Sequence, residues 1–170
     1  MSARSIDDYY YYQSPIGLIR MLETRGFLTR ADFVEQSPEA EHFQSDSMPN
    51  SNTLLKDTCR QLDEYFEGRR QKFDLALKPH GTNFQRSAWE SLLRIPYGET
   101  RSYLLQAESI RNPRAIRAIG QANSSNPIPI IIPCHRVIGK NGSLTGYAGG
   151  LDRKTRLLAL EHSFMHEQNY

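Results

Sequence analysis

The chain has 170 residues, enough for one compact domain or two small lobes. Apolar residues make up 38% of it, and seven Phe and nine Tyr can fill a core, which excludes a disordered chain. Its formal charge of +2 is uneven, because residues 1–81 carry 10 basic and 13 acidic side chains whereas residues 82–170 carry 11 and 6. A basic second half favours a polyanionic partner, although a surplus of solvated arginines gives the same balance.

No stretch approaches the ~20 apolar residues of a membrane span, and the start of the chain lacks the apolar core of a signal peptide. We therefore expect no membrane partner and a cytoplasmic location. The two cysteines, Cys59 and Cys134, lie in very different sequence surroundings. We interpret them as two separate thiols, kept reduced in the cytosol.

The first half begins with three short predicted strands and continues into a helix. Turn residues at 14–17 and 24–26 join the strands, a pattern typical of an antiparallel meander. The predicted strands span residues 9–12, 18–23 and 28–34. Residues 35–52 are polar and predict a loop, and residues 53–68 carry apolar side chains at a helical spacing. Cys59 lies on that apolar stripe, so we expect it to be a small buried residue.

The second half opens with a connecting segment. Residues 74–83 predict a strand and a linker, and residues 84–94 predict a helix that Thr82 or Asn83 caps. Residues 102–123 then predict two short helices joined by a tight turn, as in a helix-turn-helix.

The second of these short helices has an identifiable start and two predicted faces. Asn112 is a candidate cap with Pro113 at the first helical position, and Ile116 and Ile119 would face inward. The opposite face is small apart from its arginines, so it could enter a narrow groove of DNA and insert one cation into the base stack. An ordinary surface helix with solvated arginines is the alternative.

Residues 126–137 hold the best candidate for covalent chemistry. A proline-rich apolar run, predicted to be a buried strand, leads into Cys134, which lies between Pro133 and His135. The thiolate is the reactive form of cysteine, and a neighbouring His and Arg136 can favour it. Adjacent residues on an extended chain point to opposite sides, so contact between the thiol and the imidazole needs a turn or a bridging water.

A third group is needed to orient the histidine, and Glu161 is the candidate. It ends the apolar helical run 157–161, where a carboxylate is costly unless it is paired, although it could also face solvent. We expect no metal site, because Cys134 and His135 are adjacent and no other Cys or His lies at ligand spacing. A papain-like protease is disfavoured by the absence of that family's signature around the cysteine.

Eight short motifs lie between residues 82 and 163. They are Phe84-Gln85 with Trp89, Ile95-Pro96-Tyr97-Gly98-Glu99-Thr100, Ser102-Tyr103, Arg117-Ala118-Ile119-Gly120, Asn126-Pro127, Ile132-Pro133-Cys134-His135-Arg136-Val137, Gly146-Tyr147-Ala148-Gly149-Gly150, and Leu157-Leu158 with Glu161. In order and spacing they resemble the O6-alkylguanine-DNA alkyltransferases, also called methylated-DNA–protein-cysteine methyltransferases. The resemblance is weaker before residue 82, where the meander, the helix at 53–68 and Phe73-Asp74-Leu75 are similar to the first lobe of bacterial members.

The resemblance implies an α+β fold. A small antiparallel-sheet lobe of the ribonuclease H type in residues 1–81 would precede a mainly helical lobe with a helix-turn-helix in residues 82–170. The implied activity is DNA repair without a cofactor, in which O6-alkylguanine, and as a second candidate O4-alkylthymine, is flipped out of the duplex. The alkyl group would move irreversibly to the protein's own cysteine in a single turnover. The implied partner is double-stranded DNA bound through its minor groove by a monomer, associated with the nucleoid.

The resemblance also assigns roles to matching residues. Cys134 would accept the alkyl group, His135 would activate it through a water, and Glu161 would orient His135. Tyr103 would donate a proton or hydrogen bond to the departing guanine, and Asn126 would brace the turn around the thiol.

A second group of matching residues would contact DNA and the base. Arg117 would fill the gap left by the flipped nucleotide. The DNA surface would further include Tyr103, Ala118, Gly120 and Arg136. The carbonyls of Cys134 and Val137 and the amide of Ala148 would read the guanine edges, and Tyr147 would wall the pocket.

Two departures from the family pattern matter. Some members hold zinc in the first lobe, but this chain has no cysteine before Cys59, so we expect no such site. Ala148 replaces a serine found in some members, which could alter tolerance for bulky alkyl groups. Three other functions stay open: a non-catalytic lesion-binding relative, a helix-turn-helix regulator in which Cys134 senses alkylation or oxidation, and a cysteine hydrolase.

Overall fold

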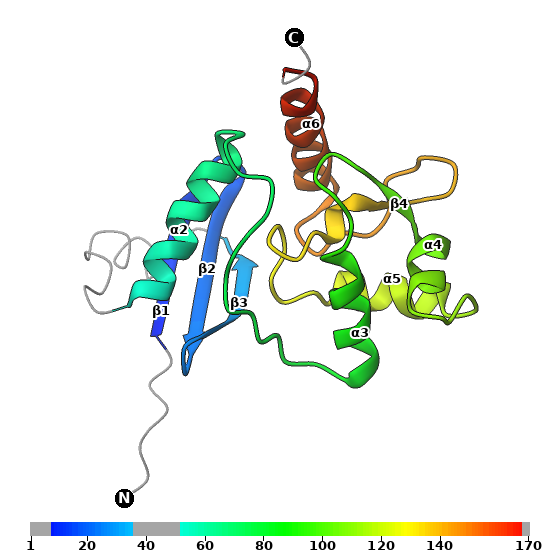
Figure 1. The fold of residues 1–170 in the computed structure, drawn as a ribbon, viewed down its shortest axis with the longest axis horizontal. Helices are drawn as coiled ribbons and strands as arrows, with labels where there is room; N and C mark the ends of the chain where they lie inside the picture. Colours follow the sequence, from blue (N-terminus) through cyan, green and yellow to red (C-terminus); the bar gives the residue numbers. More distant parts are fainter. Residues whose placement is uncertain (1–7, 36–51, 168–170) are drawn as a thin grey trace, which may run out of the picture. The chain divides into compact units, whose positions relative to one another are not determined.

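The computed structural model describes residues 8–35 and 52–167. The chain divides into two compact units, Met1–Pro79 and His80–Tyr170 (Figure 1). The predicted loop at 35–52 falls almost entirely outside the described residues. In the part of the chain that is described, no helix combines the length and the apolar character needed to cross a bilayer.

The first unit is built on the predicted antiparallel meander. Strands β1 (Asp8–Ser14), β2 (Gly17–Thr24) and β3 (Phe27–Phe33) pair in chain order. Arg25 and Gly26 both have positive φ, 53° and 83°, between β2 and β3. Two successive left-handed residues form the type I′ turn whose twist suits a tight hairpin. The prediction of three strands is confirmed.

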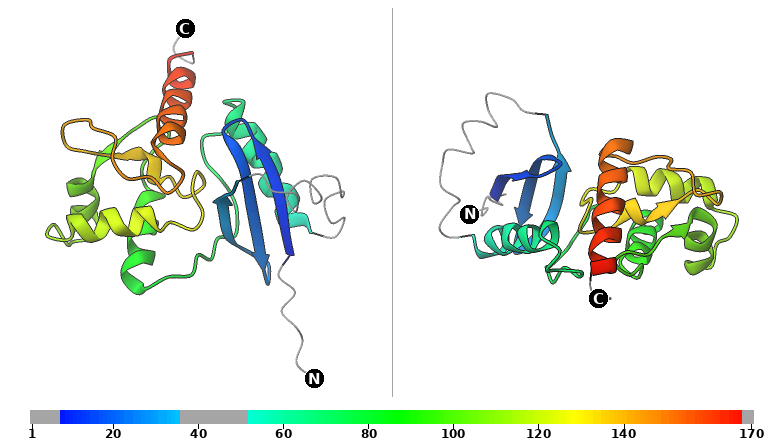
Figure 2. Two further views of the ribbon diagram at one scale, coloured as in Figure 1. Left: turned by 180° about the vertical axis from the view of Figure 1, so that it is seen from behind. Right: turned by 90° about the horizontal axis from the view of Figure 1, so that it is seen from above.

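Helix α2 (Thr53–Phe66) lies across one face of this sheet (Figure 2). The side chain of Asn52 accepts a hydrogen bond from the Leu55 amide at 2.9 Å and so caps the helix. Cys59 is 8% exposed on the packed face, as predicted. The segment predicted as a strand at 74–83 forms instead a single isolated bridge, between Leu77 and Leu28.

The second unit is mainly helical around one small parallel strand pair (Figure 2). Its elements are α3 (Asn83–Leu92), β4 (Arg101–Ser102), α4 (Tyr103–Ser109), α5 (Ile116–Ser124), the 3-10 turn η1 (Cys134–Arg136), β5 (Val137–Ile138) and α6 (Leu151–Glu167). Helix α3 begins with a capping box, in which the side chains of Thr82 and Gln85 each bond to the other's backbone amide.

Helices α3, α4 and α5 share a small apolar core. Ala88, Ala107, Ile119 and Ala122 are at most 2% exposed and pack together. The indole of Trp89 donates to the Ala122 carbonyl at 2.8 Å, so the polar atom of the largest buried side chain also holds α3 to α5. The core is built from small side chains, so the short helices approach closely and α4 and α5 form the predicted pair.

The prediction that Asn112-Pro113 opens α5 is wrong. Arg111 takes a left-handed φ of 59°, and the Asn112 amide donates to the Ala107 carbonyl at 2.9 Å. This bond and the left-handed Arg111 close the end of α4, which is a common way for a helix to end. Helix α5 therefore starts later, after Ala115, which provides no side-chain cap. Ile116, predicted to face inward, is 43% exposed.

The apolar segment before Cys134 is buried, as predicted, but it is not a strand. Backbone bonds from Ile132 to Ile128 at 2.9 Å and from Cys134 to Ile132 at 2.8 Å close successive turns. Ile130 has a φ of 72°, which a β-branched residue adopts only when its surroundings impose it. The prolines favour turns over a sheet ladder, and they deliver Cys134 at the start of η1.

Candidate active site

Cys134 is buried and is held by a side-chain amide. Only 2% of the residue is exposed. Asn126 Nδ2 donates to the Ile132 carbonyl at 2.8 Å and to Cys134 Sγ at 3.2 Å, while Asn126 Oδ1 accepts from the Ile128 amide at 3.0 Å. One side chain therefore fixes the turns before the thiol and also contacts the sulfur, which is the geometry expected of a bracing residue.

The resting state of Cys134 is a thiol. Burial raises its pKa to about 11, although the hydrogen bond from Asn126 and the positive charge of Lys154 act in the opposite direction. The expectation that neighbouring groups favour a standing thiolate is therefore not met, because loss of water outweighs them.

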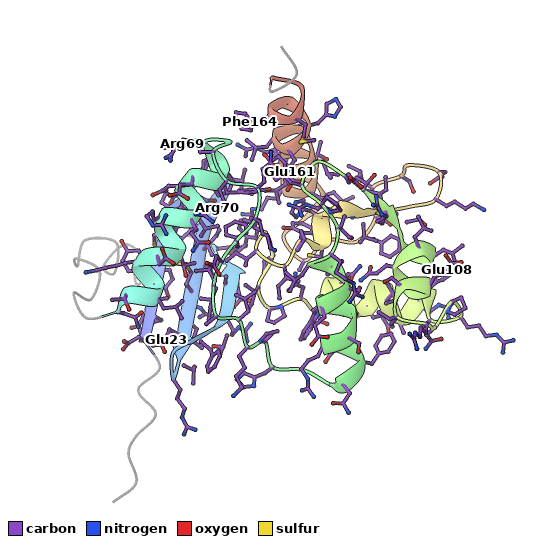
Figure 3. All side chains as sticks on the ribbon, in the orientation of Figure 1. Glu23, Arg69, Arg70, Glu108, Glu161 and Phe164 are labelled. Carbon is purple, nitrogen blue, oxygen red and sulfur yellow. The ribbon has the colours of Figure 1, made fainter. Side chains whose placement is uncertain are left out.

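Glu161, which comes from α6 (Figure 3), is the hub of a buried charge cluster. Its carboxylate accepts from His135 Nε2 at 2.8 Å, from the Arg136 guanidinium at 2.9–3.2 Å and from the Gly98 amide at 3.1 Å. Burial raises the pKa of this carboxyl, but its bonds to His135 and Arg136 outweigh burial and lower the pKa to about 2. Glu161 is thus ionised at neutral pH, and the possibility that it faces solvent is excluded.

His135 is neutral and its tautomer is defined. The residue is fully buried, and burial lowers the pKa of its imidazole even though Glu161 raises it. Since the ionised Glu161 can only accept, Nε2 carries the ring proton and Nδ1 is left as an acceptor. Nδ1 is buried and has no partner within the described residues. No hydrogen bond joins the Cys134 and His135 side chains among the described residues.

Arg136 does not occupy the position expected of a DNA-contacting residue. Only 6% of it is exposed, and its guanidinium bonds to Glu161 and to the Ile95 carbonyl at 2.7 Å. The ring of Tyr97 lies 5.6 Å from the guanidinium carbon. A side chain held in this way cannot reach a phosphate, so the structure corrects the prediction: Arg136 compensates the charge of Glu161.

Lys154 is a site residue that the sequence reasoning missed. It is 0% exposed, and Nζ donates to the Val137 carbonyl at 2.6 Å and to the Thr145 carbonyl at 2.9 Å. Burial lowers the pKa of this ammonium, and Cys134 raises it. Lys154 precedes Glu161 by two helical turns, so the shared spacing on α6 was a signal that could have identified it.

Tyr103 opens α4 and borders an open hollow of about 580 Å³. Its hydroxyl donates to the Thr145 carbonyl at 2.8 Å. Gly120 and Gly146 also border the hollow, and a Cβ at Gly120 would lie 3.9 Å from the Tyr103 ring. Their lack of side chains therefore keeps the space beside the Tyr103 ring open. Cys134 does not line this hollow.

The remaining predicted residues divide between the hollow and the interior. Arg117 is exposed and lines the hollow, and Ala118 on the same helix is half-buried. Tyr147 is 9% exposed, and its hydroxyl has no partner within the described residues. Ala148 is exposed, whereas Val137 is fully buried and its carbonyl carries the bond from Lys154. A search of the described residues finds no cluster of His, Cys, Asp or Glu suited to a metal ion.

Two family models match nearly the whole chain. Residues 8–79 match the "6-O-methylguanine DNA methyltransferase, ribonuclease-like domain", and residues 83–163 match the "6-O-methylguanine DNA methyltransferase, DNA binding domain". The chain belongs to the 6-O-methylguanine DNA methyltransferase family. The second match contains the whole cluster around Cys134 and the helices that border the hollow.

Similar proteins carry matching names. The methylated-DNA–protein-cysteine methyltransferase of Methanosarcina barkeri is 49% identical over 155 residues, which are 91% of this chain and 97% of the relative. The constitutive enzyme of that name from Bacillus subtilis is 43% identical over 159 residues, 90% of this chain and 94% of the relative.

Solved structures agree with these relatives. The crystal structure of Mycobacterium tuberculosis O6-methylguanine methyltransferase has a TM-score of 0.80 at 45% identity and covers 93% of this chain and 94% of its own. The structure of the same protein in complex with DNA has a TM-score of 0.80 at 44% identity. The match covers 92% of this chain and 93% of that protein's chain. The predicted family, the α+β fold and the methyltransferase activity in DNA repair are confirmed.

Proposed function

We propose that this 6-O-methylguanine DNA methyltransferase transfers the alkyl group of O6-alkylguanine to Cys134 and is consumed in doing so. The observation that carries the proposal is that two adjacent buried residues are each held by a partner: Asn126 donates to the Cys134 sulfur, and His135 bonds to an ionised Glu161. Cys59 is instead a core residue of the first unit, and burial raises its pKa to about 12. We therefore assign the acceptor role to Cys134 alone.

The proton of the thiol leaves to His135. Nδ1 has an open lone pair, because Nε2 holds the ring proton against Glu161. The proton moves to Nδ1 directly or through a bridging water, and the imidazolium that results is stabilised by the carboxylate. The thiolate then attacks the alkyl carbon, so that the S–C bond forms while the bond from carbon to O6 breaks. The thioether is stable and nothing in the site hydrolyses it, which makes the reaction a single turnover.

Guanine is a poor leaving group as an anion, so a proton donor lowers the barrier. Tyr103 borders the hollow, and its hydroxyl proton is engaged with the Thr145 carbonyl. Entry of the base would exchange that bond for one to the guanine ring. The departing base takes up the proton of the Tyr103 hydroxyl, and the phenolate that results regains a proton from the His135 imidazolium, directly or through water. Over the whole reaction the thiol proton of Cys134 therefore ends on guanine and the alkyl group ends on sulfur, so atoms and charge balance.

The site also has groups suited to read guanine and to steady the developing thiolate. The Val137 carbonyl accepts from Lys154, and the Cys134 carbonyl accepts from the Val137 amide. Each keeps a second lone pair for a base edge. The Ala148 amide and the ring of Tyr147 complete the proposed pocket. The positive charge of Lys154 lowers the pKa of Cys134, which favours the thiolate once proton transfer begins.

Double-stranded DNA is the proposed partner, bound through its minor groove by a monomer in the cytoplasm. The alkylated base lies inside the duplex and must be flipped out, at a cost of a few kcal/mol. Arg117 is exposed and lines the hollow, so it can fill the vacated place in the stack. Ala118 and Gly120 are small enough to let α5 approach the groove closely.

The test is to incubate the protein with a duplex that carries one O6-methylguanine and to map the product by mass spectrometry. We expect the methyl group on the peptide that contains Cys134. Cys134→Ala should bind the duplex and transfer nothing, whereas the matched variant Cys59→Ala should transfer at the unaltered rate. Binding without any methylation of the unaltered protein would identify a non-catalytic lesion-binding relative instead.

A further inference from the structure

Ile116 is a large apolar side chain in an unusual position. It is the first residue of α5 and is 43% exposed, whereas Ile119, one helical turn later, is fully buried in the core of the α3, α4 and α5 helices. Ile116 does not belong to that core, and a large part of its side chain stays in contact with solvent among the described residues. Its exposure keeps apolar surface in water, which is unfavourable unless a partner covers it.

The surroundings of Ile116 point to one kind of partner. Ile116 lines the open hollow together with Tyr103 and Arg117. Arg114 and Arg117 are exposed on either side of it in the sequence, and neither forms an ion pair with a carboxylate of the described residues. Exposed apolar surface beside Arg117 in the hollow, with a second unpaired arginine two residues earlier in the chain, suits a ligand with phosphates outside and flat apolar faces inside, which is a DNA duplex.

We propose that Ile116 is an apolar wedge that enters the DNA beside Arg117 and holds open the base step next to the flipped nucleotide. This inference rests on the proposed function, since only a flipped base creates such a step. Arg117 supplies charge in the vacancy, and Ile116 supplies apolar contact with the exposed base face. Proteins that bind the minor groove commonly insert aliphatic side chains in this way. The wedge gains contact only when the step opens, so it favours lesions that unstack easily over intact pairs.

The experiment compares Ile116→Ala with the matched control Leu93→Ala. Leu93 is 47% exposed at the end of α3 and does not line the hollow. For Ile116→Ala we expect methyl transfer from a duplex to slow roughly fivefold, as for loss of about half the apolar surface of one isoleucine. Transfer from free O6-methylguanine base should be unchanged, and Leu93→Ala should match the unaltered protein on both substrates.

A second measurement, the fluorescence of a base analogue in the duplex, tests the wedge independently of methyl transfer. A duplex with 2-aminopurine next to the lesion should brighten on binding, because that base loses its stacking partner, and Ile116→Ala should brighten it less. Equal rates and equal fluorescence for Ile116→Ala and the unaltered protein overturn the inference, as does an equal loss on duplex and free base. If the unaltered protein transfers no methyl group, the proposed function fails, and the fluorescence comparison still decides the wedge.

Discussion

Replacement of Glu161 by Gln separates the structural and chemical parts of the buried cluster. Gln keeps the shape and can still accept from His135, but it leaves the Arg136 guanidinium buried without a countercharge. Breaking a buried ion pair in this way costs about 3–5 kcal/mol. The lowering of the Glu161 pKa from its usual 4.5 to about 2 gives an independent figure of about 3 kcal/mol at neutral pH. We expect Glu161→Gln to lose about that much unfolding free energy.

The pH dependence supplies a second test of the same charge. A carboxyl whose pKa is lower in the folded state stabilises the protein above its unfolded pKa, and this contribution is lost as pH falls toward the folded value. For Glu161 the window runs from 4.5 down to about 2. Urea unfolding at neutral pH and at several points within this window should show a shallower decline for Glu161→Gln than for the unaltered protein.

Chemistry and stability should then separate in a double variant. Glu161→Gln with Arg136→Met removes both charges, so it should recover much of the lost stability. It should not recover methyl transfer, which we expect to fall at least about tenfold because the His135 imidazolium loses its carboxylate. Single-turnover transfer from a methylated duplex measures this. A Glu161→Gln variant that is as stable and as fast as the unaltered protein would show that the carboxylate supports neither the fold nor the transfer.

Three further changes test other parts of the site. Lys154→Met removes a charge that lowers the pKa of Cys134, so transfer should slow and its pH profile should move to higher pH; an unmoved profile would contradict this role. Tyr103→Phe should slow single-turnover transfer at least about tenfold by removing the proton donor, and an unchanged rate would exclude that role. Gly120→Ala should stabilise α5 by up to about 1 kcal/mol in thermal unfolding, since its Cβ would make an ordinary 3.9 Å contact, yet slow repair of duplex DNA. Unimpaired duplex repair by Gly120→Ala would show that the glycine is not needed for DNA entry.

The sequence predicted the elements that depend on local patterns. The three strands, the helix that contains Cys59 and a cap at Thr82 or Asn83 follow from alternation, helical spacing and the preference of Thr and Asn for a cap, and the structure selects Thr82. The pairing of His135 with Glu161 followed from the resemblance, because the residues alone suited a Glu161 that faces solvent. The sequence alone could not place Arg136, because its nearness to Cys134 suited either a DNA surface or a buried countercharge.

The failures have local causes. The start of α5 was misplaced because Arg111 adopts a left-handed conformation more typical of glycine, and this uses Asn112 to finish α4. With the helix start placed too early, Ile116 was predicted to share the inward face of Ile119. Ile116 instead lies outside the core that α3, α4 and α5 share. Lys154 was overlooked because a lysine in a helix is usually solvated, and only tertiary packing shows that two carbonyls hold it in the interior.

Cys134 is proposed to be an alkyl acceptor that each protein chain uses once. The direct measurement is to mix the protein with a large excess of duplex carrying O6-methylguanine and to follow, over time, the guanine restored and the mass of the protein. The guanine restored should level off at one equivalent per chain, with each chain carrying one methyl group on Cys134. Continued repair beyond one equivalent, or a methyl group on Cys59, would contradict the account.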